Sequence, residues 1–174
     1  MGSTGSADAT SVRRLTTVPL DEESWTPFGW LPVTDLDPRD GQLRLAYAWD
    51  DVHVNRIAHT RDEVPATADG LRCEMLYRHE THTQVLMVLD HPAVIAVAPA
   101  AVDFTEPADA EWIVAFSLEP QDSLVLHRGT WHWGPFPRHA EVVTMFNVQG
   151  LRYAEDNDMV DLAGKGMAVE VVLA

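Results

Sequence analysis

Short apolar runs recur along the chain, and turn-forming pairs separate them. The pairs are Asp-Pro, Asp-Gly, Glu-Pro and His-Pro, and runs of this kind that are rich in β-branched and aromatic residues predict β-strands. Because amphipathic helix is nearly absent between them, we expect an antiparallel sandwich or barrel rather than a parallel α/β sheet. The predicted strands are residues 13–18, 43–49, 71–79, 84–89, 94–97, 112–116, 124–126, 142–148 and 169–173.

One short helix interrupts this pattern near the start of the chain, at residues 19–29. Asp21 is a suitable N-cap, two glutamates follow it in the first turn, and Gly29 can end the helix. Trp25 and Phe28 are then expected to face inward together. The predicted fold class is therefore all-β, an antiparallel β-barrel with short helices attached.

The chain has the length of one domain. Its 174 residues contain no internal repeat and no composition break, and a domain commonly takes roughly 100 to 200 residues. Residues 1–12 are small and polar, so they cannot bury enough surface to offset the entropy lost on ordering them. We expect a flexible N-terminus at 1–12 and a single domain at 13–174.

The composition disfavours several classes of protein. Hydrophobic residues make up 46% and charged residues 22%, and no apolar run approaches the roughly 18 residues of a membrane span. The formal net charge of -15 repels a phosphate backbone, so we expect neither a nucleic-acid nor a membrane partner. Because Cys73 is the single cysteine and the chain start lacks a secretory pattern, we expect a cytoplasmic protein.

Two polar segments fall at predicted strand ends, where chemistry is expected. Strand alternation places Tyr77 and His79 on one face with Cys73 and Met75, and we expect this face to point into the barrel. A hairpin with the following strand would bring Gln84 close to His79 in the same cavity. The two segments are residues 77–84 and 127–132.

The spacing of these segments resembles the two boxes of the cupin superfamily, which place a His-x-His pair, a Glu and a distant His around a metal. Tyr77 stands at the first His position, His79 at the second, Gln84 at the Glu position and His132 at the last. The resemblance implies a metal site of His79, Gln84 and His132 for a divalent ion such as Mn, Ni, Zn or Fe. The Tyr and Gln replacements weaken that site, so a site without metal is an equal alternative, and His82 is a substitute ligand.

More specifically, the chain resembles the ureidoglycolate lyase family of small bacterial cupins from about residue 15 to about residue 147. The segment that ends in a Trp-His pair, with a proline shortly after it, is the most specific match. The segments that carry the resemblance are Trp25-Thr-Pro-Phe-Gly29, Arg78-His79 followed by Thr83-Gln84, Ala115-Phe116, His127-Arg-Gly-Thr-Trp-His132 with Pro135, and Val143-Thr-Met-Phe146.

The departures from the family pattern fall where the substrate would be decided. Tyr77 replaces an acidic residue, Glu80 a proline, Trp133 a second His and Met145 an aspartate. The family's strand ends in Asp-Arg, whereas this one ends in Gln-Gly, which leaves Arg152 as the nearest guanidinium.

The family resemblance implies that ureidoglycolate is split into glyoxylate and urea. This elimination needs a base for the carbinol hydroxyl and an acid for the departing nitrogen. His79 and His132 suit both tasks, because the histidine pKa lies near neutrality. Gln84 can orient a carbonyl, and Tyr77 is a further candidate at the catalytic centre.

The same reaction needs a cation for the substrate carboxylate. The candidates are Arg72, Arg78 and Arg152, because a guanidinium grips a carboxylate as a fork. Trp133 is expected to line the pocket beside them. The resemblance also implies a homodimer that acts on a small molecule.

Two alternatives remain open at this point. One is a diverged cupin enzyme, a lyase, isomerase or decarboxylase, with a more apolar pocket for another small carboxylate or biosynthetic intermediate. The other is a cupin that binds a small molecule without turnover. A pocket that holds both histidines but no arginine would count against ureidoglycolate, and an aromatic pocket would favour the diverged enzyme.

Other polar residues are interpreted as structural. His53, His59, His91 and His139 are expected at the surface or in turns. The acidic stretch at residues 154–158 is expected to be a solvated loop, since its spacing fits no calcium-binding loop.

Overall fold

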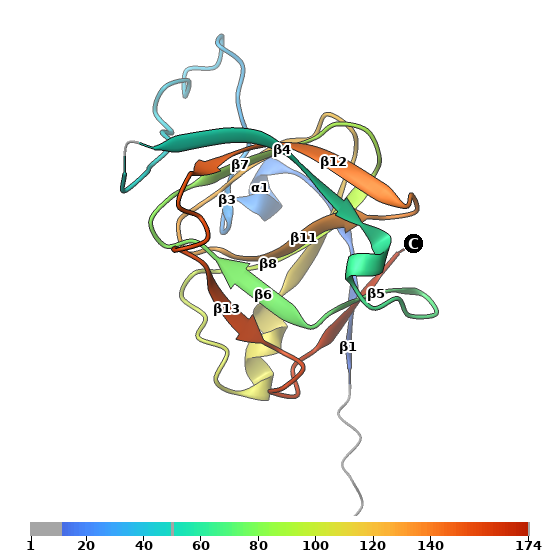
Figure 1. The fold of residues 1–174 in the computed structure, drawn as a ribbon. Helices are drawn as coiled ribbons and strands as arrows, with labels where there is room; N and C mark the ends of the chain where they lie inside the picture. The colour runs from blue at the N-terminus through green and yellow to red at the C-terminus, as the bar shows by residue number, and fades with distance from the viewer. Residues whose placement is uncertain (1–11, 50, 174) are drawn as a thin grey trace, which may run out of the picture.

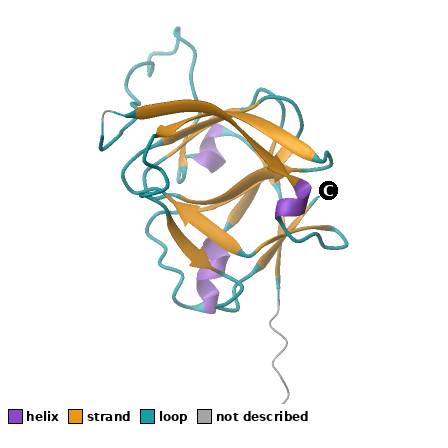
Figure 2. Cartoon of the chain, in the orientation of Figure 1, coloured by secondary structure: helices purple, strands orange, loops and turns teal. Residues whose placement is uncertain are grey.

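The computed structural model describes residues 12–49 and 51–173, which form β-sheets with little helix (Figures 1 and 2). The predicted flexible N-terminus lies, except for residue 12, outside the described residues. The strands are β1 (Arg13–Thr16), β2 (Val18–Pro19), β3 (Gly29–Trp30), β4 (Val52–Thr60), β5 (Gly70–Cys73), β6 (Met75–Arg78), β7 (Gln84–Val88), β8 (Ala93–Ala98), β9 (Val114–Leu118), β10 (Ser123–Leu126), β11 (Trp131–Pro137), β12 (Val142–Gly150), β13 (Asp158–Asp161) and β14 (Val169–Val172). The helices are α1 (Glu22–Trp25) and the 3₁₀ turns η1 (Arg61–Glu63) and η2 (Pro107–Trp112).

Two large sheets form the body of the molecule, and a small third sheet joins them. The five-stranded sheet has the order β3-β10-β7-β12-β4, and the six-stranded sheet has the order β13-β6-β11-β8-β9-β2. In Figure 1, β4, β7 and β12 cross the top of the molecule, while β11, β8 and β6 lie below them. Most described pairings are antiparallel, the exceptions being β1 with β14 and β2 with β9. The predicted all-β class is confirmed.

The buried strand β8 shows how the core is divided. Its odd-numbered residues from Ala93 to Val97 join one apolar cluster, and its even-numbered residues from Val94 to Ala98 join the other. All six side chains are buried, because both faces of the six-stranded sheet are covered at this strand. None of the described helices is both long and apolar enough to cross a membrane.

The predicted helix at 19–29 is confirmed in place but is shorter. The Asp21 side chain accepts a hydrogen bond from the Ser24 backbone at 2.9 Å, as an N-cap does. The helix buries Trp25, whose Nε1 donates to the Val125 carbonyl at 3.2 Å. Gly29 follows where a Cβ would stand 1.7 Å from that same carbonyl oxygen, so only glycine fits there.

The predicted strand at 43–49 is wrong, and β4 takes its place. Residues 43–49 form only an isolated bridge between Tyr47 and His82, and Leu43 and Leu45 are exposed. β4 pairs with β12 along its whole length, but Val52 and Val54 on its outer face are exposed. The usual pattern of apolar residues inside and polar residues outside is therefore reversed at the start of this strand, which is why it was missed.

The predicted strand at 71–79 is interrupted at Glu74. β5 pairs with β14 in the small sheet, whereas β6 lies between β11 and β13 in the six-stranded sheet. The break shifts the alternation of side chains. Cys73 and Leu76, which were expected on opposite faces of one strand, therefore pack in the same core cluster. The expectation that Cys73 shares a face with Tyr77 and His79 is therefore wrong. The helical turn η2 likewise replaces the start of the predicted strand at 112–116.

Candidate functional site

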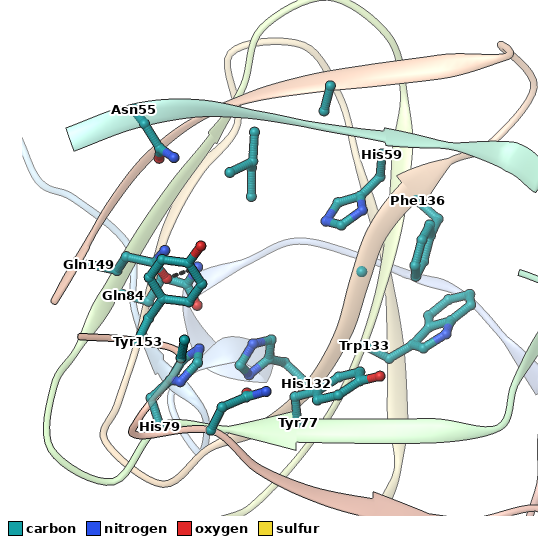
Figure 3. Close-up of a pocket in the computed structure, with 15 residues that line it drawn as sticks. Asn55, His59, Tyr77, His79, Gln84, His132, Trp133, Phe136, Gln149 and Tyr153 are labelled. Atoms are coloured by element: carbon teal, nitrogen blue, oxygen red, sulfur yellow. Dashed lines mark hydrogen bonds between the residues drawn. The ribbon is translucent and has the colours of Figure 1, made fainter. Parts of the chain in front are cut away.

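A cavity of about 560 Å³ lies between β4 and the strands β6 and β11. Figure 3 shows the rings of His79 and His132 on one side of it, with Gln84 and Gln149 beside them and His59 and Phe136 across it. The residues that line it are Asn55, Ile57, Ala58, His59, Tyr77, His79, Gln84, His132, Trp133, Gly134, Phe136, Gln149, Tyr153, Ala154 and Asn157.

Strand pairing brings the two central histidines together. His132 pairs with Tyr77 across β11 and β6, and His79 follows β6 directly. The ring centres of His79 and His132 are 5.4 Å apart. The ring of His82 stacks on that of His79, with their centres 4.6 Å apart. His79 thus contacts both of the other imidazoles, and His82 is not among the described residues that line the cavity.

Backbone carbonyls fix the protonation pattern of the two cavity histidines. His79 Nδ1 is 2.6 Å from the Asp156 carbonyl oxygen, and His132 Nδ1 is 3.2 Å from the Thr130 carbonyl oxygen. Because a carbonyl can only accept, each Nδ1 carries the hydrogen and donates it. Each Nε2 is then left with its lone pair.

Burial keeps both rings neutral at neutral pH. It lowers the pKa of His79 below the ordinary value, and it lowers the pKa of His132 to about 3, with the neighbouring His79 acting in the same direction. A neutral imidazole accepts a proton or a hydrogen bond, and a pKa of about 3 makes His132 a weak base at neutral pH. Neither ring is a preformed acid.

Asp156 anchors the loop that holds His79. Its carboxylate accepts hydrogen bonds from the backbone of Glu80 at 3.0 Å, from the backbone of Thr81 at 2.8 Å and from the Thr81 hydroxyl. Burial alone would raise the pKa of Asp156, but these hydrogen bonds together hold it below its ordinary value. The sequence predicted a solvated loop at 154–158, and this prediction is wrong for Asp156. The stretch positions a site residue and leads into β13.

A ladder of side-chain amides forms the cavity wall next to the histidines. Gln84 Nε2 donates to Asn147 Oδ1 at 2.9 Å and lies 3.3 Å from Gln149 Oε1. Asn147 Nδ2 in turn donates to Asn55 Oδ1 at 2.8 Å. Within the described part of the chain, Gln84 Oε1 is buried without a hydrogen-bond partner. Because an unmade buried hydrogen bond is costly, this oxygen is ready to accept one from a ligand.

The structure brings together most of the candidates named from the sequence. Tyr77, His79, Gln84, His132 and Trp133 all line the cavity. Gln84 reaches His79 across two different sheets rather than through the expected hairpin.

The predicted arginines lie elsewhere, and none of them is among the residues that line the cavity. Arg72 is 4.0 Å from Glu74, Arg78 lies over the ring of Trp131 and pairs with Asp158, and Arg152 pairs with Asp51 at 2.9 Å. Arg78 follows Tyr77 in β6, so alternation turns it to the opposite face of that strand. Arg72 belongs to β5, which lies in the small sheet.

Sequence reasoning missed several residues of the site. Asn55 and His59 come from β4, and His59 was expected at the surface or in a turn. Tyr153 and Asn157 come from the loop between β12 and β13. The one available signal was the alternation of polar residues at 53, 55 and 59, which is typical of a strand whose inner face meets a polar cavity.

Two sets of donors, which share His79, suit a metal ion. In the predicted set, His79 Nε2, His132 Nε2 and Gln84 Oε1 all keep free lone pairs, and carbonyls orient both rings as in many metal sites. In the second set, donor atoms of His79, His82 and Asp156 lie within 4.8 Å of one another. His82 Nδ1 lies 3.2 Å from the Asp156 carboxylate, and Nε2 of this buried ring has no hydrogen-bond partner among the described residues. The residues therefore fit a divalent ion.

The comparison with protein families agrees with the fold. No curated protein matches the sequence. A family model described as ureidoglycolate lyase matches residues 12–165, a span that contains all the residues lining the cavity. The chain belongs to the ureidoglycolate lyase family.

Proposed function

We propose that this protein is a carbon–nitrogen lyase that releases urea from a carbinolurea, a compound in which one carbon carries a hydroxyl and a ureido group. The family supports lyase chemistry on ureidoglycolate-like compounds. The observation that carries the proposal is the pairing of a neutral, oriented base, His79, with the unpartnered acceptor Gln84 Oε1 in one cavity wall.

The reaction follows from the protonation state of the histidines. His79 Nε2 takes the hydroxyl proton, the carbon–oxygen double bond forms, and the carbon–nitrogen bond breaks with its electrons going to nitrogen. Because no acid is preformed, the proton on His79 is then delivered to that nitrogen. The products are a carbonyl compound and urea. His132 Nε2 accepts a hydrogen bond beside this path and holds the substrate in place.

Gln84 selects the ureido group. Its Oε1 accepts an N–H of the substrate, and its amide hydrogens are already committed to the side chains of Asn147 and Gln149. A ureido group offers the N–H donors that this oxygen lacks. A substrate without such donors would leave Oε1 buried and unpaired, which disfavours it.

The charge of the cavity favours a neutral substrate over ureidoglycolate itself. Neither arginine nor lysine is among the described residues that line it, and the histidines are neutral, so a carboxylate finds no fixed counter-charge there. Ureidoglycolate is the second candidate, and the free donors of His79, Gln84 and His132 favour it. A divalent ion held by them would supply positive charge for the carboxylate.

Urea release from two substrates tests the proposal. Purified protein is assayed with ureidoglycolate and with the neutral adduct of urea and acetaldehyde, after chelation and again with added manganese, nickel or zinc. Turnover of the neutral adduct after chelation is the expected result. Turnover of ureidoglycolate with metal alone would establish the second candidate.

Absence of turnover would contradict the proposal. If folded protein releases urea from neither compound above the uncatalysed rate, the lyase proposal is wrong. Saturable binding of either compound without turnover would then leave a small-molecule binding protein. Metal content measured on the Gln84→Ala and His82→Ala variants separates the two donor sets, because the predicted set loses its ion only in the first.

A further inference from the structure

A second cavity of about 390 Å³ adjoins the histidine site. The two cavities share His59, Tyr77, Trp133 and Phe136, which line both. The remaining walls of the second cavity, called here the side chamber, are Glu63, Val64, Pro65, Glu74 and Met75.

The combined space is larger than a ureido compound of glycolate size requires. Cavities of roughly 300 to 1,000 Å³ enclose ligands of drug size, and the histidine cavity alone has about 560 Å³. A compound with only a hydroxyl, a ureido group and a short chain fills the histidine end and leaves the side chamber to water.

Aromatic side chains stand where the two cavities meet. The rings of Trp133 and Phe136 are 4.6 Å apart, and the ring of His59 is 5.0 Å from that of Phe136. A register shift in β11 between Trp133 and Phe136 turns both side chains to the same cavity. Gly134 makes this possible with φ of +87°, where a Cβ would stand 2.8 Å from the Phe136 nitrogen.

The side chamber offers an anion no cationic side chain, and its two carboxylates already have partners. Its titratable groups are His59, Glu63, Glu74 and Tyr77, and no arginine or lysine lines it within the described part of the chain. Glu63 accepts from His59 at 2.8 Å and from the Thr60 backbone, and Glu74 lies 4.0 Å from Arg72. Both carboxylates thus have partners of their own, and Val64, Pro65 and Met75 among the remaining walls are apolar.

We infer that the substrate carries an uncharged aryl or alkyl arm that passes between Trp133 and Tyr77 into the side chamber. This inference rests on the proposed function and names its substrate class, a carbinolurea of a hydrophobic aldehyde. Apolar surface buried against Val64, Pro65 and Met75 provides the affinity. The same apolar walls offer a carboxylate, such as that of ureidoglycolate, neither a hydrogen-bond donor nor a counter-charge.

Two neutral substrates of different size test the inference. The adducts of urea with acetaldehyde and with phenylacetaldehyde differ only by the phenyl group. We expect kcat/KM for urea release to be about tenfold or more higher for the phenyl compound, as burial of a phenyl ring allows. Met75→Trp fills the side chamber and should abolish this preference while the acetaldehyde adduct is still cleaved. Val64→Phe is the second variant in case the first does not fold.

Met87→Trp is the matched control, because Met87 is half-buried on β7 and lines neither cavity. It should keep the full preference. Equal rates for the two adducts in the wild-type protein would overturn the inference and leave the lyase proposal intact. Binding of ethylurea and phenethylurea, which lack the hydroxyl and are not cleaved, gives a separate readout. Phenethylurea should bind about tenfold or more tightly, even if urea release fails, and equal binding overturns the inference.

Discussion

His79 is the residue on which the proposed chemistry depends most directly. His79→Gln keeps a polar side chain but cannot take a proton at neutral pH. We expect kcat for urea release to fall about 10²- to 10⁴-fold, the usual contribution of a general base. Thermal unfolding should change little, because the ring lines a cavity rather than the apolar core.

The exposed His91 provides the control for this substitution. His91→Gln should keep wild-type kinetics. Full turnover by His79→Gln would remove His79 from the mechanism.

Asp156 is a positioning residue. Its backbone carbonyl accepts the hydrogen bond of the His79 ring, and its carboxylate holds the loop that follows His79. Asp156→Ala removes the hydrogen bonds to Glu80 and Thr81, so the His79 ring is no longer fixed. We expect kcat to fall about tenfold to a hundredfold with little change in KM, as misplacement of a reacting group does. Asp156→Asn keeps one acceptor oxygen and should restore part of the rate.

Asp158→Ala is the comparison, since Asp158 is exposed and pairs with Arg78 outside the cavity. No rescue by Asn, or an equal loss in Asp158→Ala, would contradict the positioning role.

At the residue scale, the sequence revealed the histidines but not the charge of the site. His79, Gln84 and His132 belong to two sequence segments that resemble known boxes. Strand pairing brings these segments together in the fold, so the resemblance located the site. The three arginines were candidates for binding a carboxylate only because of their residue type. Each of them instead contacts an acidic or aromatic side chain outside the cavity. The role of Asp156 depends on a backbone carbonyl, which no side-chain pattern reveals.

The element that shapes the cavity most sharply is β11, through its irregularity at Gly134. Gly134→Ala places a Cβ against the Phe136 nitrogen in a conformation that favours glycine. We expect the free energy of unfolding to fall by about 1 to 3 kcal/mol, and the preference for the phenyl substrate to weaken. Urea denaturation and the two-substrate assay measure both effects.

Gly41→Ala is the control that separates the steric clash of the new Cβ from the strain of a positive φ. Gly41 also has a positive φ, of +75°, but a Cβ there would meet nothing within 4 Å. It should lose less stability than Gly134→Ala and no selectivity. Equal losses in the two variants would show that the wall of Trp133 and Phe136 does not depend on this close contact.

Strand prediction succeeded where one face of a strand is apolar and failed where the site lies. β7, β8 and β12 carry buried apolar residues, and all three were expected near their observed positions. β4 faces a polar cavity with Asn55 and His59, so its alternation lacks an apolar inner face. The break at Glu74 was invisible because residues on both sides of it favour strands.

At the scale of the whole molecule, buried neutral histidines make stability depend on pH. The pKa of His82 is lowered to about 4 and that of His132 to about 3, in both cases first by burial. The unfolded chain takes up these protons near the ordinary histidine pKa of about 6.5, whereas the folded chain does not. Their stabilisation is therefore complete above about pH 6.5 and is lost as the pH falls from there toward 4 and 3.

Between pH 7 and pH 5, we expect each of these two histidines to lower the free energy of unfolding by roughly 2 kcal/mol. His132→Gln should flatten this slope, whereas His139→Gln, at an exposed position, should leave it unchanged. Denaturation curves at the two pH values measure the slope, and a flat profile would contradict it. Relief of the net charge of -15 opposes the effect mainly below this range, because carboxylates titrate near pH 4. A metal ion bound to neutral imidazoles steepens the slope, so the same curves with and without chelator report whether His79 and its neighbours hold one.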